Sequence, residues 1–209
     1  MESRAQNIVS KTNNRISIRV MPGHFATNHS HVNYYVDMTA IKTSAKMAKE
    51  AAAELGAEFN NTYVDTVICL EGTEILGAFL ADVLTQNGIN QGKDINVVTP
   101  EMNAVNQMIF RDNTQNMIWG KKVLLLISSA STGKSINRAM DCLQYYSGDL
   151  AAVGAIFSAI DEVDGIEVRS LFHGNDLAEY GNYAANECPM CKNGIKVDAL
   201  VNSFGYSKI

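Results

Sequence analysis

Two hydrophobic spacings alternate along the middle of the chain. Some short runs are apolar at nearly every position, as in strands that are buried on both faces of a sheet. In other runs apolar residues recur every three or four positions, as in helices with one buried face. The predicted strands are residues 62–70, 95–98, 122–127, 151–160 and 167–172. The predicted helices begin near residues 43, 75 and 136 and stop at or near Gly56, Gly88 and Gly148.

Strands and helices that alternate in this way predict an α/β fold, with a parallel sheet that helices cover on both faces. The chain ends do not follow the alternation and are expected to form a small hood. Within the first segment, residues 15–20 alternate like a short strand and residues 22–35 are interpreted as an ordered loop. Residues 99–120 show no clean period and are expected to be a long loop around a short element. The expected units are an N-terminal hood and substrate loop (1–40), the α/β core (41–172) and a C-terminal extension (173–209) that packs on the hood or on a second subunit.

Composition and charge narrow the class of protein. The chain has 209 residues, of which 46% are hydrophobic and 19% charged, as is typical of a globular domain with a full core. A net charge of −5 argues against a broad basic surface for nucleic acid, but leaves room for a local cationic pocket. No apolar run approaches the roughly 20 residues that span a bilayer, and the first residues do not resemble a signal peptide. We therefore expect a cytoplasmic protein without a membrane partner, whose four cysteines are reduced or metal-bound.

A small polar loop separates the strand at 122–127 from the helix that begins near residue 136. Ligands of open parallel sheets bind beyond the carboxyl ends of the strands. Here a glycine permits a tight turn, and the N–H groups that open the helix have no internal partner. The helix dipole adds positive charge, so the loop predicts a phosphate cradle, with an ordinary capped helix as the alternative. The predicted phosphate-binding residues are Ser131, Thr132, Gly133, Lys134 and Ser135.

Two families use a loop of this kind. P-loop nucleotidases carry G-x-x-x-x-G-K-[ST], which residues 128–135 match except at the first glycine. Type I phosphoribosyltransferases carry an apolar strand, two acidic residues, a T-T-G-x-[ST]-like loop and a helix, and VLLLISSASTGKS at 123–135 resembles that motif. Residues 23–37 look like the N-terminal substrate loop of the orotate phosphoribosyltransferases. Residues 64–81 look like that family's first core strand, pyrophosphate loop and following helix.

The resemblance to type I phosphoribosyltransferases implies a five-stranded parallel core with a smaller hood. It implies transfer of ribose 5-phosphate from phosphoribosyl pyrophosphate to a ring nitrogen of orotate or a related base, a pentosyltransferase reaction of nucleotide metabolism. A magnesium ion would hold the pyrophosphate, and the protein would be a homodimer. Tyr34 and Tyr35 could stack on the planar base, with one of the two facing it. The residues that match the family's pyrophosphate loop are Glu71, Gly72, Thr73 and Glu74.

The chain departs from the family pattern at two places. Aligned on the T-G pair, the two acids that hold the ribose hydroxyls fall at Ile127 and Ser128, so Ser128 and Ser129 become the ribose-facing residues. A serine can bond a hydroxyl but brings no charge to balance a developing cation. The loop before the signature strand offers Arg111 as the catalytic cation, without the family's Lys-x-His pair. Asp161 and Glu162, which end the next strand, could replace the missing acids.

These departures leave three functions open. The chain could be an active transferase, a catalytically impaired sensor that binds a phosphosugar or nucleotide without turnover, or a P-loop-like nucleotidase. We favour the transferase over the sensor, and the sensor over the nucleotidase. The expected ligands are a small phosphosugar and a base.

The spacing of the last two cysteines is compatible with a metal site. The two sulfurs of Cys188-Pro-Met-Cys191 could bind one zinc ion, but structural zinc takes four ligands and the chain has no second C-x-x-C. His173 is the nearest candidate for a third ligand, and a second subunit could supply the rest. We favour a structural turn over zinc, and zinc over a redox pair, because the cysteines do not open a helix after an early strand.

Three further histidines lie in the N-terminal segment. They could hold a metal together with Asp37, but binding of a base or phosphate, or simple surface exposure, is favoured. Trp119 is expected to pack in the interior, and the apolar tail 201–209 is expected to dock on the hood or on a partner. The three histidines are His24, His29 and His31.

Overall fold

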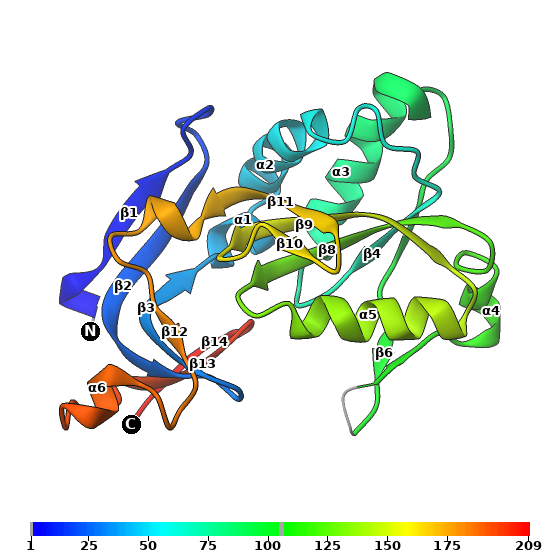
Figure 1. Ribbon diagram of the computed structural model, residues 1–209. Helices are drawn as coiled ribbons and strands as arrows, with labels where there is room; N and C mark the ends of the chain where they lie inside the picture. Colours follow the sequence, from blue (N-terminus) through cyan, green and yellow to red (C-terminus); the bar gives the residue numbers. More distant parts are fainter. Residues whose placement is uncertain (1, 105–106) are drawn as a thin grey trace.

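The computed structural model describes residues 2–104 and 107–209 and contains two large sheets (Figure 1). The core sheet has the strand order β10-β11-β9-β8-β4-β5. Its five longer strands run parallel, as predicted, and only β10 is antiparallel, at the edge beside β11. The core strands are β4 (Thr66–Cys69), β5 (Asn96–Val98), β8 (Lys122–Ala130), β9 (Asp149–Ser158), β10 (Glu162–Val163) and β11 (Ile166–His173).

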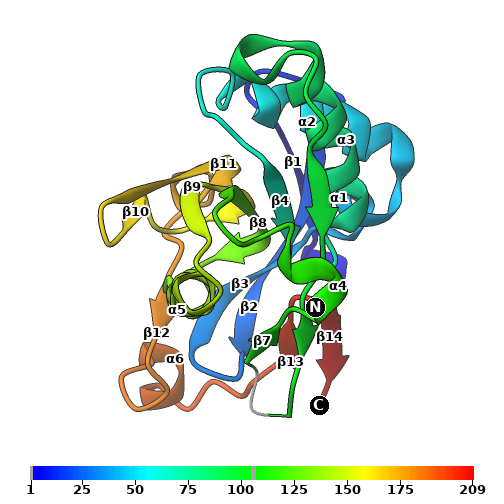
Figure 2. The ribbon, with the colours of Figure 1, turned by 90° about the vertical axis from the view of Figure 1, so that its right-hand side faces the viewer.

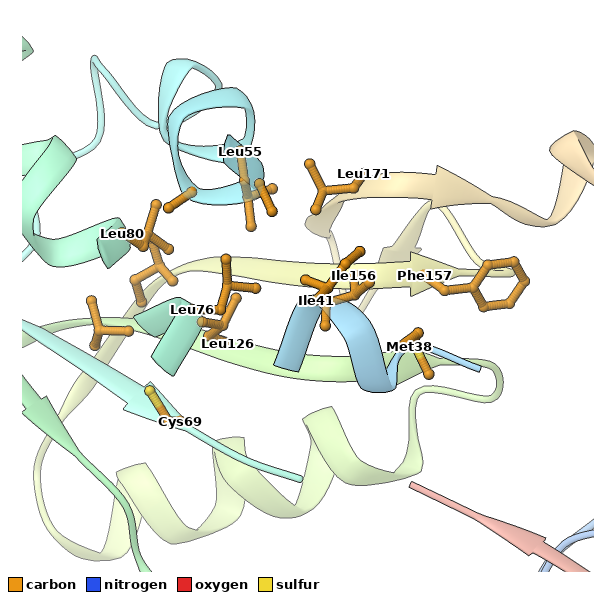
Figure 3. Packing of buried hydrophobic residues seen from close by; sticks show 14 of the residues in the cluster. Met38, Ile41, Leu55, Cys69, Leu76, Leu80, Leu126, Ile156, Phe157 and Leu171 are labelled. Atoms are coloured by element: carbon orange, nitrogen blue, oxygen red, sulfur yellow. The ribbon is translucent and has the colours of Figure 1, made fainter. Parts of the chain in front are cut away.

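Helices cover both faces of the core sheet, which confirms the predicted layers. Figure 2 looks along α5, which lies on the opposite side of β8 from α2 and α3. Alternate residues of β8 face the two layers. Leu124 and Leu126 pack in the cluster with α1–α3, where Figure 3 labels Leu126, and Leu125 packs in the cluster with α5. The helices are α1 (Thr39–Thr43), α2 (Ala45–Ala57), α3 (Glu74–Gln86), α4 (Asp112–Gln115), α5 (Lys134–Tyr145) and α6 (Pro189–Lys192).

Both ends of the chain build the second sheet, called here the terminal sheet. Its order is β12-β3-β2-β13-β14, with β1 on the free part of β2, and its own small core includes Met21, Phe25 and Tyr35. The predicted hood is therefore present, and the apolar tail does dock on it. Its strands are β1 (Gln6–Val9), β2 (Ser17–Ala26), β3 (His31–Asp37), β12 (Asn182–Tyr183), β13 (Ala199–Asn202) and β14 (Gly205–Lys208).

The interpretation of residues 22–35 as a loop is wrong. They form the second half of β2, a short turn and most of β3. Pro22 hid the strand, because proline is rare inside strands except at edges and bulges, and the pairing of β2 with β3 shifts register between Pro22 and Phe25. The shift also breaks the alternation of apolar and polar residues on which the prediction depended.

Three smaller predictions need correction. Gly56 does not end its helix: α2 continues to Ala57, and a Cβ at Gly56 would lie 2.7 Å from Val83 Cγ1, so this glycine allows α2 and α3 to pack closely. Trp119 does not pack inside, since 69% of it is exposed. Residues 128–130, expected in the polar loop, continue β8 and pair with β9.

The region 99–120 is less irregular than predicted. It contains the hairpin β6 (Glu101–Met102) and β7 (Met108–Ile109), followed by α4, while residues 105 and 106 lie outside the described residues. Three short 3-10 turns complete the fold at Glu2–Arg4, Gly88–Asn90 and Gly174–Asp176. Within the described ranges, no helix has the length and apolar character needed to cross a membrane.

Candidate functional site

The predicted phosphate loop lies at the carboxyl end of β8. The strand ends at Ala130 and α5 begins at Lys134, so the loop itself is only residues 131–133. Gly133 is the N-cap of α5 with φ +74°, a left-handed conformation that favours glycine. Among the described residues, no group accepts a hydrogen bond from the backbone N–H of Thr132, Gly133 or Lys134. These N–H groups therefore remain available to an anion, as the sequence predicted.

The shortness of this loop argues against a P-loop. Residues 128–130 would have to leave the strand to wrap a β-phosphate, but Ser129 and Ala130 pair in register with Phe157 and Ser158 of β9. The chain therefore lacks both the first glycine of the nucleotidase motif and the longer loop that this glycine would begin. What remains is a three-residue turn that can grip a single phosphate group.

A cavity of about 640 Å³ lies between the phosphate loop and the terminal sheet. Figure 1 shows the terminal sheet beside the end of α5 that carries the loop. The core sheet supplies residues 131–136 and the loop after β4, and the terminal sheet supplies the hairpin β2–β3 and the turn between β13 and β14. The site is therefore bounded by segments from the start, the middle and the end of the chain.

The loop after β4, which resembles a pyrophosphate loop, has an unusual backbone. Glu71 and Gly72 have φ of 60° and 82°, and the first is costly for a residue with a side chain. The Glu71 carboxylate accepts hydrogen bonds from the hydroxyl of Ser128 at 2.6 Å and from the backbone N–H of Ser129 at 3.4 Å. These contacts hold the strained turn against β8.

The other two residues of this loop differ in position. Glu74 is the first residue of α3 and lines the cavity. Thr73 is buried, and its hydroxyl donates to the carbonyls of Leu70 and Leu126 at 2.9 and 3.1 Å. Thr73 thus stabilises the loop from its buried side, while the other three residues of the loop line the cavity: Glu71, Gly72 and Glu74.

Lys42 is a residue that sequence reasoning missed. It lies in α1, and its Nζ donates to the carbonyl of Glu71 at 3.3 Å and to the carbonyl of Ser203 in the β13–β14 turn. Burial lowers the pKa of Lys42, and the nearby carboxylates of Glu71, Asp37 and Glu74 oppose that shift. No local motif surrounds this lysine, so only the fold reveals that it joins the two walls of the cavity.

Aromatic side chains line the cavity on the side of the terminal sheet. Tyr34 and Tyr35 both reach it. Tyr35 is largely buried and packs its ring on Phe25 and Tyr206, with ring centroids 6.1 and 5.3 Å apart. Burial, with the charge of Asp37, raises the pKa of Tyr35 to about 12. Phe204 in the β13–β14 turn also lines the cavity and is 80% exposed, a position the sequence did not single out.

Several predicted site residues lie elsewhere. Ser129 lines the cavity, but Ser128 is fully buried, with its hydroxyl on Glu71. Arg111 forms a two-pronged ion pair with Glu101, at 2.8 Å for each hydrogen bond, and is not among the residues that line the cavity. Two carboxylates proposed as substitute acids are exposed and also stand outside the lining: Asp161 and Glu162.

A second cluster lies at the far end of the terminal sheet. Cys188 and Cys191 meet His24 and His31 there, with all four ligand atoms within 4.8 Å of one another. The predicted third ligand, His173, is not part of this group; its backbone N–H donates to Asp176. The cysteine pair was predictable from its spacing, but the histidines are about 160 residues away in the chain and only the fold brings them near.

Sequence comparison finds relatives across most of the chain. The orotate phosphoribosyltransferase of Chlorobium phaeobacteroides is 24% identical over 182 residues, which are 86% of this chain and 88% of the relative. That of Caldanaerobacter subterraneus subsp. tengcongensis is 24% identical over 185 residues, 83% and 85% of the two chains. No protein-family model matches the chain. The likeness to orotate phosphoribosyltransferases is thus distant but nearly full-length.

Comparison with solved structures shows the fold. A phosphoribosyltransferase from Corynebacterium diphtheriae has a TM-score of 0.53 and 20% identity, covering 76% of this chain and 90% of that one. The orotate phosphoribosyltransferase of Mycobacterium tuberculosis, solved with 5-phospho-alpha-D-ribosyl 1-diphosphate, has a TM-score of 0.53 and 16% identity, covering 69% and 83%. The protein therefore has a phosphoribosyltransferase-like α/β fold with a separate terminal sheet.

Proposed function

We propose that this protein is a phosphoribosyltransferase that acts on a planar base of the orotate class. A ring nitrogen of the base bonds to C1 of the ribose and gives up its proton to the solvent, and the bond from C1 to the pyrophosphate oxygen breaks, its electron pair leaving with pyrophosphate. The observation that carries the proposal is the set of free N–H groups at residues 132–134, at the rim of a cavity in a phosphoribosyltransferase-like fold. The distant orotate phosphoribosyltransferase relatives support the same reaction.

The cavity offers a place for each part of the substrates. Residues 131–135 suit the 5-phosphate, because backbone donors and the α5 dipole favour a dianion. The loop at 71–74 lies across the cavity, where the pyrophosphate would sit, with Lys42 behind it. The base would lie against Tyr34 and Phe204, since exposed or half-buried aromatic rings stack on planar heterocycles.

Magnesium fits the carboxylates present at this site. Mg²⁺ in phosphate sites is usually held by one or two carboxylates together with substrate oxygens. Glu71 and Glu74 line the cavity and supply that donor type. The ion would neutralise charge on the departing pyrophosphate.

Glu71 can replace the charge that the signature strand lacks. The family's acidic pair would fall at Ile127 and Ser128, neither of which carries charge. The carboxylate of Glu71 is held on the hydroxyl of Ser128 and the N–H of Ser129, so a negative charge stands beside the position of the missing acids. We therefore assign Glu71 to electrostatic stabilisation of the positive charge that develops on the ribose.

A second candidate, the phosphosugar or nucleotide sensor, is favoured by one specific observation. Arg111, the cation expected to help the departing group, is paired with Glu101 outside the cavity lining. Lys134 and Arg138, both in α5, line the cavity, but a site in which Arg111 stays paired with Glu101 could bind substrate without turning it over.

The deciding experiment measures pyrophosphate release and binding side by side. The protein is given phosphoribosyl pyrophosphate, Mg²⁺ and each of a panel of pyrimidine and purine bases, with a reaction lacking base as the control for hydrolysis. We expect base-dependent release of pyrophosphate and calorimetric binding of phosphoribosyl pyrophosphate and ribose 5-phosphate. Binding without release on any base would select the sensor, and no binding of either compound would reject both functions.

A further inference from the structure

The four-residue cluster at the end of the terminal sheet has the composition of a metal centre. His24 lies in β2 and His31 in β3, on the two arms of one hairpin, while Cys188 and Cys191 lie at the start of α6. Figure 1 and Figure 2 both place α6 beside the end of the β2–β3 hairpin. The site lies away from the cavity, because none of these four residues lines it.

The four ligand atoms lie within 4.8 Å of one another, close to the spacing around a tetrahedral ion. His24 Nε2 lies 3.6 Å from each sulfur, and Cys191 Sγ lies 3.2 Å from His31 Nδ1. Zinc bonds of about 2.3 Å to sulfur and 2.0–2.1 Å to nitrogen put tetrahedral N and S ligands about 3.6 Å apart. His24 Nε2 and His31 Nδ1 are 2.9 Å apart. These two nitrogens would have to move slightly apart to reach the spacing of about 3.4 Å that a tetrahedral zinc ion requires.

The surroundings orient the ligands. His24 Nδ1 lies 2.8 Å from the carbonyl of Ile195, and a carbonyl can only accept, so Nδ1 carries the proton. The lone pair of Nε2 then points into the cluster, which is the usual arrangement of a metal-bound histidine. Around the cysteines, the N–H of Lys192 donates to the carbonyl of Cys188, and the N–H of Gly194 donates to the carbonyl of Cys191, so the backbone on both sides of the C-x-x-C segment is held in turns.

We propose that His24, His31, Cys188 and Cys191 bind one zinc ion. Two thiolates and two neutral imidazoles are a common structural zinc set, and four protein ligands leave no open position for catalysis. Binding releases one proton from each thiol, and the two thiolates balance the charge of the ion. His24 and Cys188 are buried, whereas Cys191 is exposed and gives the ion a path into the site.

The ion would hold together two segments of the terminal sheet that line the cavity. It joins the β2–β3 hairpin, which carries Tyr34, to the segment that leads into β13 and the turn with Phe204. These segments are more than 150 residues apart in the chain, so the ion closes a long loop of the unfolded protein. The proposal is independent of the reaction assigned above, because it concerns the stability of the terminal sheet.

The experiment measures metal content and ligand type in the full chain. Protein refolded under reducing conditions with zinc, then desalted, is analysed for zinc per chain. A second sample is loaded with Co²⁺, whose visible and near-ultraviolet absorption reports tetrahedral geometry and thiolate bonds. We expect about one zinc per chain, tetrahedral Co²⁺ bands with thiolate charge transfer, and a fall in Tm of at least about 5 °C on chelation.

Matched variants separate the site from general damage. Cys191→Ser and His31→Ala should lose at least tenfold in zinc affinity, whereas Cys142→Ser and His29→Ala should keep it, since neither residue belongs to the cluster. Cys191 is exposed, so its variant should fold. Zinc-free native protein after reconstitution, a Cys188–Cys191 disulfide found by mass, or full zinc content in Cys191→Ser would each overturn the proposal.

Discussion

At the scale of single residues, two positions give the sharpest tests of the proposed binding and turnover of a phosphosugar. Gly133 combines a left-handed backbone with a close neighbour, since a Cβ there would lie 2.8 Å from Val163 Cγ2. A side chain at this position would therefore press on Val163 of β10. Glu71 has a strained backbone, and its carboxylate lies against Ser128, one of the two positions at which the family has an acid.

Replacing Gly133 with alanine should weaken phosphate binding. The loop must shift to relieve both the positive φ and the contact with Val163, and its N–H groups then lose their common direction. We expect at least a tenfold loss of affinity for ribose 5-phosphate by calorimetry. Gly120→Ala is the control, because Gly120 has φ +66° but nothing within 4 Å of its added Cβ. Equal losses in the two variants would mean that backbone strain alone, and not the phosphate loop, explains the effect.

Replacing Glu71 with glutamine should separate turnover from binding. The amide is nearly the same size as the carboxylate and can still accept from Ser128, but it removes the charge. Because charge-assisted interactions contribute about 1.5–3 kcal/mol, we expect kcat to fall roughly 10- to 100-fold. Affinity for ribose 5-phosphate should stay within about threefold, as this ligand lies on the other loop. Unchanged kcat would remove Glu71 from the reaction.

At the scale of elements, how well each was predicted from sequence depended on how local its signal was. The parallel strands and their helices were predictable because β8 and its neighbours are buried on both faces and so apolar throughout. The β2–β3 hairpin was missed, because Pro22 and a register shift interrupt its alternation. The phosphate loop followed from its position after a strand, whereas Lys42 and the partners of Cys188 and Cys191 depend on contacts between distant segments.

The β13–β14 turn offers a test of the cavity's aromatic side. Phe204→Ala should raise the KM for the base at least several-fold, because stacking area is lost. Its effect on the free energy of unfolding should stay within about 0.5 kcal/mol, since the ring is 80% exposed and packs on little else. Tyr145→Ala is the control, an equally exposed aromatic on α5 that does not line the cavity. Steady-state kinetics and urea unfolding check both parts, and an unchanged KM would place the base elsewhere.

At the scale of the whole molecule, the cavity is shared between two sheets that the chain builds in different ways. The core sheet forms from neighbouring strand–helix units, while the terminal sheet collects strands from both ends. Lys42 joins the two, with one contact to each wall. In the proposed reaction, the residues that would hold the phosphates belong to the core and the aromatic residues belong to the terminal sheet, so the two substrates would meet where the sheets face each other.

The parallel pairing of β13 with β2 has a consequence for how the protein is made. β2 is synthesised well before β13, so the end of β2 that pairs with β13 waits for this neighbour until the chain has been made as far as β13. During that interval the end of β2, beyond its pairing with β1, has no partner on one side, and an unpaired strand edge is prone to join other chains. A nascent chain stalled before residue 199 would therefore have a folded core sheet and an unpaired part of β2 that could pair with another chain.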